Sequence, residues 1–191
     1  MLKKIDFSLF EQAKPETVSG GLLQEGLTML LPVNDELQSV INLVGKNTIC
    51  FWVSDGSWSM HDMLVSLLNI TGTAELFIAT YAMSETPARI ITQLKAAKQI
   101  TRLTTILDNR VDTRSAGSFQ LMKAMSDEMV MVDVHAKVTL IINENWQLAV
   151  IGSANYTENK RFETGIIAEA NNVVELQKKW MLKALKDGIK Q

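Results

Sequence analysis

Residues 135–155 read HAKVTLIINENWQLAVIGSAN, and this stretch decides the fold that the sequence predicts. It holds two apolar runs, 138–142 and 147–151, which have the length and composition of β-strands. Residues 143–146 separate the runs and form a loop of a length common in β-hairpins. A hairpin returns the chain to the level at which it began, so we expect the two ends of this stretch to lie side by side.

Both ends of the predicted hairpin carry residues that suit phosphate chemistry. His135 and Lys137 are two positions apart, so in an extended segment their side chains point to the same face. An imidazole can act as a nucleophile or general base near neutral pH, and an ammonium supplies positive charge for a phosphoryl oxygen. At the other end, Gly152 permits close backbone approach, and Ser153 and Asn155 add a hydroxyl and an amide that suit an anion.

The rest of the chain alternates between patterns typical of strands and of helices. Further strands are predicted at residues 48–53, 75–81, 101–107, 129–134 and 162–168. Helices are predicted within residues 34–45, 60–68, 84–97, 119–125 and 173–189. This alternation predicts an α/β fold in one domain, with a mixed, largely parallel sheet flanked by helices.

Composition restricts the possible environments and partners. The formal net charge of −2 gives no overall attraction to nucleic acid, so any such contact must be local. Cys50 is the only cysteine, which excludes an internal disulfide and a cysteine-rich metal site, and its apolar neighbours favour a buried thiol. The apolar runs are shorter than the roughly 18 to 20 residues that a membrane-spanning helix needs, and no signal peptide is evident. We therefore expect a cytoplasmic protein without stable membrane insertion.

The pattern at the hairpin resembles the motif of the phospholipase D superfamily. That motif is His-x-Lys, four residues, Asp, and then Gly-Ser-x-Asn. The matching residues, in order, are His135, Lys137, Gly152, Ser153 and Asn155. Ile142 stands where the family has Asp, a residue that the tyrosyl-DNA phosphodiesterase branch also lacks. The resemblance covers about residues 48–170, and it implies that residues 46–191 form a phospholipase D-like domain to which residues 1–45 add an N-terminal arm and helix.

The resemblance implies a metal-independent reaction in two steps, without a cofactor. His135 would attack phosphorus to form a phosphohistidine, and a second histidine would protonate the leaving oxygen and then activate water. Glu163 stands where the family has a glutamate that hydrogen-bonds to a catalytic histidine and orients it. The residues implied to bind the phosphate are Lys137, Gly152, Ser153 and Asn155.

A single motif in the chain predicts an assembly. The only other histidine, His61, is not followed by x-Lys, and we assign it no role. Two copies across a two-fold axis would supply both histidines, as in the small single-motif nucleases of the family. We therefore expect a homodimer through the active-site face, with His135 of each subunit facing the other and nucleic acid as the substrate.

The sequence leaves several alternatives open. The chain could hydrolyse or transfer phospholipids, or it could be a catalytically inactive phospholipase D-like module that binds phosphate-bearing partners. Ser153 and Asn155 could instead cap a helix, which is a common use of such residues. Four loop cations, either a phosphate-binding rim or plain solvated charge, complete the candidate list: Arg110, Arg114, Lys160 and Arg161.

Overall fold

The computed structural model describes residues 34–158 and 160–190, so most of the predicted N-terminal arm lies outside the described residues. The helices of this part are α1 (Asp35–Ile41), α2 (Met60–Thr71), α3 (Glu85–Ala96), α4 (Val111–Arg114), α5 (Ala116–Met125) and α6 (Asn171–Asp187). The strands are β1 (Ile49–Ser54), β2 (Ala74–Thr80), β3 (Ile100–Asp108), β4 (Glu128–Val132), β5 (Val138–Ile142), β6 (Gln147–Gly152), β7 (Glu163–Glu169) and β8 (Ile189–Lys190). Each predicted helix and strand over these residues is confirmed, with ends shifted by a few positions.

The eight strands form one mixed sheet in the order β1-β7-β6-β5-β2-β3-β4-β8. Only the β2–β3 and β3–β4 pairings are parallel, and the other pairings are antiparallel. The sheet is therefore mixed, as expected, but neighbouring strands are less often parallel than the alternation of strands and helices predicts. The reason is local: β5, β6 and β7 follow one another as an antiparallel meander, and β1 lies beyond this meander instead of beside β2.

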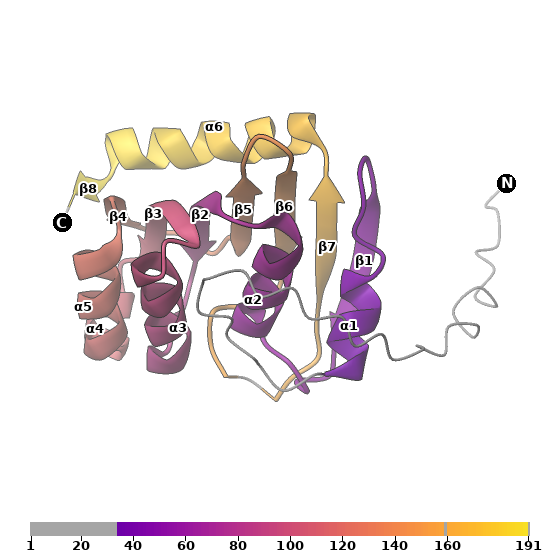
Figure 1. Cartoon of the computed structure of the whole chain (residues 1–191). Helices are drawn as coiled ribbons and strands as arrows, with labels where there is room; N and C mark the ends of the chain where they lie inside the picture. Colours follow the sequence, from indigo (N-terminus) through magenta and orange to yellow (C-terminus); the bar gives the residue numbers. More distant parts are fainter. Residues whose placement is uncertain (1–33, 159, 191) are drawn as a thin grey trace, which may run out of the picture.

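Helices cover both faces of the sheet and create two hydrophobic cores (Figure 1). Strand β2 shows the division, because its side chains alternate between the two faces. Leu76 and Ile78 pack with helices α1 to α5, whereas Phe77 and Ala79 pack on the side of α6. All four side chains are buried, so β2 is covered on both faces. This central position fixes the end of β2, where the candidate site begins.

Helices α1 and α2 each begin at a residue that caps the helix. The side chain of Asn34 accepts a hydrogen bond of 2.9 Å from the amide of Leu37 and so caps α1. At the start of α2, the carboxylate of Asp62 accepts from the amide of Ser59 at 2.8 Å, which is half of a capping box. Among the described helices, none combines the length and the apolar character that crossing a lipid bilayer requires.

Candidate active site

The candidate site lies where several strands end. Strands β2, β3 and β4 run parallel, so their carboxyl ends meet at one edge of the sheet. Strand β6 has the same direction, because two antiparallel steps through β5 separate it from β2. Residues at or just after such strand ends are the usual location of ligand sites in open α/β sheets. Here they bring Tyr81, Asp108, His135 and Ser153 to one edge.

His135 and Lys137 lie in direct contact, as the spacing predicts. Their segment is not a strand, because β4 ends at Val132, earlier than predicted. The Lys137 Nζ atom nevertheless lies 3.2 Å from Nδ1 and 3.3 Å from Nε2 of His135, and it donates to the His135 carbonyl at 2.7 Å. His135 is exposed and Lys137 is half-buried. Burial lowers the pKa of the Lys137 ammonium, and the charge of Glu163, followed by Tyr81, opposes that decrease.

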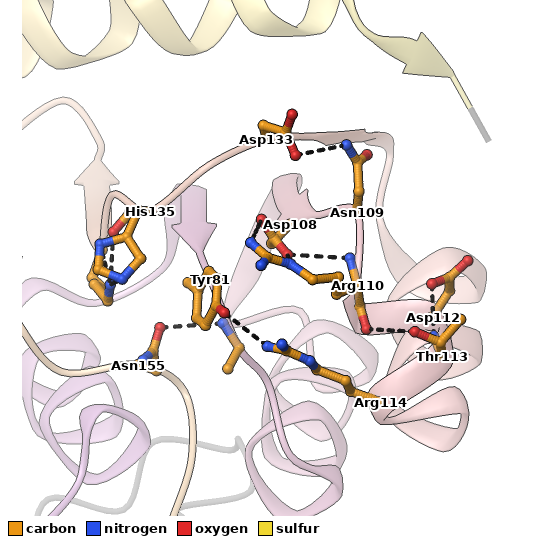
Figure 2. A network of polar contacts seen from close by, with 12 residues as sticks. Tyr81, Asp108, Asn109, Arg110, Asp112, Thr113, Arg114, Asp133, His135 and Asn155 are labelled. Atoms are coloured by element: carbon orange, nitrogen blue, oxygen red, sulfur yellow. Dashed lines mark hydrogen bonds and ion pairs between the residues drawn. The ribbon is translucent and has the colours of Figure 1, made fainter.

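Tyr81 connects this pair to two arginines (Figure 2). Its ring centroid lies 4.9 Å from that of His135, at an interplanar angle of 59°. Arg114 donates to the Tyr81 hydroxyl at 2.9 Å, and the Arg110 guanidinium lies 4.7 Å from the ring centroid. The Lys137 Nζ atom is 5.4 Å from the same centroid. Three cations therefore surround one aromatic ring next to the exposed histidine.

A buried carboxylate holds one of these cations in place. The Asp108 side chain is 1% exposed and accepts from Arg110 Nε at 2.6 Å and Nη2 at 3.0 Å. This two-point contact with Arg110 lowers the pKa of Asp108, and the carboxylate in turn raises the pKa of the guanidinium. Because Asp108 ends β3, the sheet itself orients the arginine beside Tyr81.

The second half of the site is the loop after β6. Ser153 donates to the Glu163 carboxylate and accepts from the amide of Thr164 at 3.0 Å. No hydrogen bond among the described residues joins Glu163 to His135, so the expected contact of these two side chains is absent. The structure places Glu163 beside Ser153, where its negative charge still acts on Lys137.

Asn155 is anchored to the end of β2. Its Oδ1 atom accepts from the Thr80 hydroxyl and from the Ala82 amide, each at 3.2 Å. The amide NH₂ group of Asn155 remains the donor end of the side chain. Neither Ser153 nor Asn155 caps a helix, because no helix of the described residues begins after β6 and before α6. The helix-cap alternative is therefore wrong.

Two glycines allow the strands at the site to approach closely. Gly152 pairs with Gly165 across β6 and β7, and the Trp52 ring of β1 lies over both. A Cβ atom on Gly152 would come within 2.7 Å of Trp52, and one on Gly165 within 2.6 Å. A side chain at either position would therefore collide with the Trp52 ring.

Ile142 lies away from these groups. It ends β5 and packs on the α6 side of the sheet, whereas His135 and Lys137 precede the start of the same strand. At about 3.3 Å per residue, the five-residue interval from Lys137 corresponds to roughly 16 Å. The apolar residue at the family's Asp position therefore removes no group from the edge where Lys137 and Ser153 meet.

Sequence reasoning missed Tyr81 and Asp108 as parts of the site. Both follow the general rule that functional residues lie at the carboxyl ends of parallel strands, and that rule is the signal that could have found them.

Arg110 and Arg114 of the predicted rim lie against Tyr81. Arg161 lines a small hollow that Asn155 and Glu163 also line, and Lys160 lies against Gly56. His61 is buried, at 6% exposure.

Comparisons with known proteins bear on the fold. No protein-family model matches the sequence, and no curated protein matches it. The phospholipase D family member Nuc from Salmonella typhimurium superimposes with a TM-score of 0.55, at 17% identity over 75% of this chain and 97% of Nuc. NucT from Helicobacter pylori gives 0.59, at 17% identity over 75% of this chain and 99% of NucT.

A third structure, polyphosphate kinase from Porphyromonas gingivalis, matches with a TM-score of 0.56 at 17% identity, over 74% of this chain and 26% of the kinase. Identities this low establish the arrangement of helices and strands and nothing more. Nuc and NucT are matched over almost their whole length, so the likeness extends over a complete domain of each. The chain has the fold of the phospholipase D superfamily.

Proposed function

We propose that the protein is a metal-independent phosphodiesterase that cleaves a nucleic-acid backbone. The observation that carries this proposal is the contact of His135 with Lys137 at the edge where Ser153 and Glu163 meet. A nucleophile, a cation and short polar donors are what displacement at a phosphodiester requires. The fold alone does not select the substrate, because it is shared with a protein named polyphosphate kinase.

The proposed reaction has two steps. A ring nitrogen of His135 attacks phosphorus, a P–N bond forms, and the bond between phosphorus and the leaving oxygen breaks while a second histidine gives that oxygen a proton. Water then attacks the phosphohistidine, the P–N bond breaks, and the second histidine takes a proton from the water. Lys137 offsets charge on the phosphoryl oxygens in both steps, and the NH₂ group of Asn155 donates to them.

The second histidine is proposed to come from another copy of the chain. His61 is a poor candidate, because it is buried and its Nδ1 atom lies 2.8 Å from the Ser59 hydroxyl. His135 is exposed and can meet its twin across a two-fold axis. In a mixture of wild-type chains with an excess of His135→Ala chains, we expect activity to fall in proportion to wild-type homodimers. Activity proportional to all wild-type chains would contradict the shared site.

Nicking of supercoiled DNA in excess chelator tests the proposed function. We expect cleavage by the wild-type protein and none by His135→Ala, together with a covalent protein–DNA adduct that forms only in wild-type reactions stopped with denaturant at alkaline pH, where the P–N bond survives. Cleavage that persists in His135→Ala would sink the proposal. Release of head groups from phospholipid vesicles, with no cleavage of DNA or RNA, would favour the lipid alternative. Binding of phosphate esters without turnover would favour the inactive module.

A further inference from the structure

A pocket of about 250 Å³ opens next to the candidate site. Tyr81 forms one wall of the pocket, and the Tyr81 ring also contacts the ring of His135. Thr157 forms another wall and lies two residues after Asn155, in the same loop. The pocket is therefore bounded on two sides by residues that lie next to the groups proposed to act on the phosphodiester.

Two residues that line the pocket carry hydroxyls for which the described residues offer no hydrogen-bond partner. The Oγ atom of Ser84 and the Oγ1 atom of Thr157 are both buried and unpaired. Ser84 occupies the position before α3 where a serine normally caps the helix, yet its side chain makes no capping bond. Buried polar groups are usually satisfied, and a rotation of either side chain toward the pocket would let a ligand satisfy its hydroxyl.

The remaining walls are apolar or planar. Met83 and Val111 are buried and contribute apolar surface. Arg114 also lines the pocket, and among the described residues it forms no ion pair, since its guanidinium donates to the Tyr81 hydroxyl instead. The guanidinium group of arginine and the phenol ring of tyrosine are both planar surfaces on which heteroaromatic rings stack.

We propose that this pocket binds the nucleobase of a nucleotide adjacent to the scissile phosphodiester. The volume lies below the roughly 300 to 1,000 Å³ of pockets for drug-sized ligands, which suits one ring system. A hydroxyl can both donate and accept, and therefore matches the mixed edge of a base better than a phosphate, which only accepts. The proposal rests on the proposed function, because it assumes a nucleic-acid substrate, and it implies that the base leaves its stack on binding.

Oligonucleotides with one abasic position test this pocket. An abasic residue is placed in turn on either side of the scissile bond, and kcat and KM are measured with the wild-type protein. We expect one of the two positions to raise KM by about tenfold, as the loss of one base–aromatic stacking contact does elsewhere. The other position is expected to change KM little. Equal rates with the intact substrate and with both abasic substrates would overturn the proposal.

Hydroxyl-deleting variants connect the effect to the pocket. Thr157→Val is expected to raise KM for the intact substrate severalfold, without a change for the sensitive abasic substrate. Thr104→Val is the matched control, because Thr104 Oγ1 is also buried and unpaired but does not line the pocket. An equal effect of both variants would assign the change to the fold and not to base binding. An effect of Arg114→Gln alone, equal for intact and abasic substrates, would mean that the pocket holds a phosphate.

A binding measurement separates this proposal from the proposed function. The His135→Ala protein is titrated against an oligonucleotide with 2-aminopurine at the sensitive position, or at each position in turn if the wild type cleaves nothing. Transfer of the base from its stack to the pocket should change the emission, and Thr157→Val in the same background should weaken that change. A change in emission without wild-type cleavage would contradict the proposed function alone. Cleavage without a change in emission would contradict the base pocket alone.

Discussion

The two histidines of the chain occupy opposite environments. His135 is exposed and contacts Lys137 and Tyr81. The Tyr81 ring in turn contacts two arginines, Arg110 and Arg114. His61 is buried in α2, with its Nε2 atom 3.8 Å from the Asp62 carboxylate and with Glu158 as a further negative charge. One side chain is open to a phosphate and surrounded by cations, whereas the other is enclosed and faces carboxylates. Residue type alone therefore says little about chemistry, and the charges around each ring decide it.

The largest expected effect separates the two residues by activity. His135→Gln should lower kcat by about a thousandfold or more, as loss of a nucleophile does in other enzymes. His61→Gln should retain activity within a fewfold but should lower the free energy of unfolding by roughly 1 to 3 kcal/mol, because it disturbs a buried hydrogen bond. Nicking assays and urea unfolding of both variants measure this. The comparison would break if His61→Gln abolished cleavage while its unfolding midpoint stayed at the wild-type value.

Lys137 should show the next largest effect, because it gives the His135 side its charge. Lys137→Met is expected to lower kcat by about 100-fold or more, as loss of one group that stabilises the transition state does elsewhere. Lys179→Met is the control, since that lysine is exposed on α6 and lies outside the site. Single-turnover cleavage at saturating substrate gives the comparison. Similar rates for both variants would show that the contact between Lys137 and His135 has no catalytic role.

Much of this site could be predicted from residues 135–155 alone. A hairpin joins its ends through local geometry, so His135, Lys137 and Ser153 come to the same edge whatever the other strands do. The position of β1 could not be predicted, because its pairing with β7 joins distant parts of the chain that carry no local signal for one another. The same reason hid the contact of the Tyr81 ring with His135, since it depends on the order of the strands.

The pH dependence of stability should report on His61. Burial lowers the pKa of His61 from its ordinary value of 6.5, and Asp62 and Glu158 oppose that decrease only in part. Below about pH 6.5 the unfolded chain takes up a proton that the folded chain resists, so stability should fall as the pH decreases from 7.5 to 5.5. Urea unfolding across this range measures how steeply the free energy of unfolding changes with pH for wild type and for His61→Gln. Asn69→Gln, on the same helix, is the control.

We expect the slope to be smaller in His61→Gln and unchanged in Asn69→Gln. An unchanged slope in His61→Gln would mean that other groups cause the pH dependence.

The smallest expected effect concerns Glu163. Its negative charge opposes the decrease in the pKa of Lys137, so Glu163→Gln should lower that pKa further. The alkaline limb of the pH–rate profile should then move to lower pH. Glu158→Gln, which acts on the His61 side, should leave the limb in place. A shift to higher pH in Glu163→Gln would contradict the assigned electrostatic role.

The Trp52 ring over Gly152 and Gly165 has a consequence for the order of events in folding. The meander of β5, β6 and β7 is local and can form early, but Trp52 comes from β1, which joins the sheet only when distant parts of the chain meet. The packing of Trp52 over Gly152 and Gly165 is therefore expected to form late in folding. In refolding from urea, we expect cleavage activity to return with the slow phase in which tryptophan emission reaches its native value, and not with the earlier recovery of secondary structure.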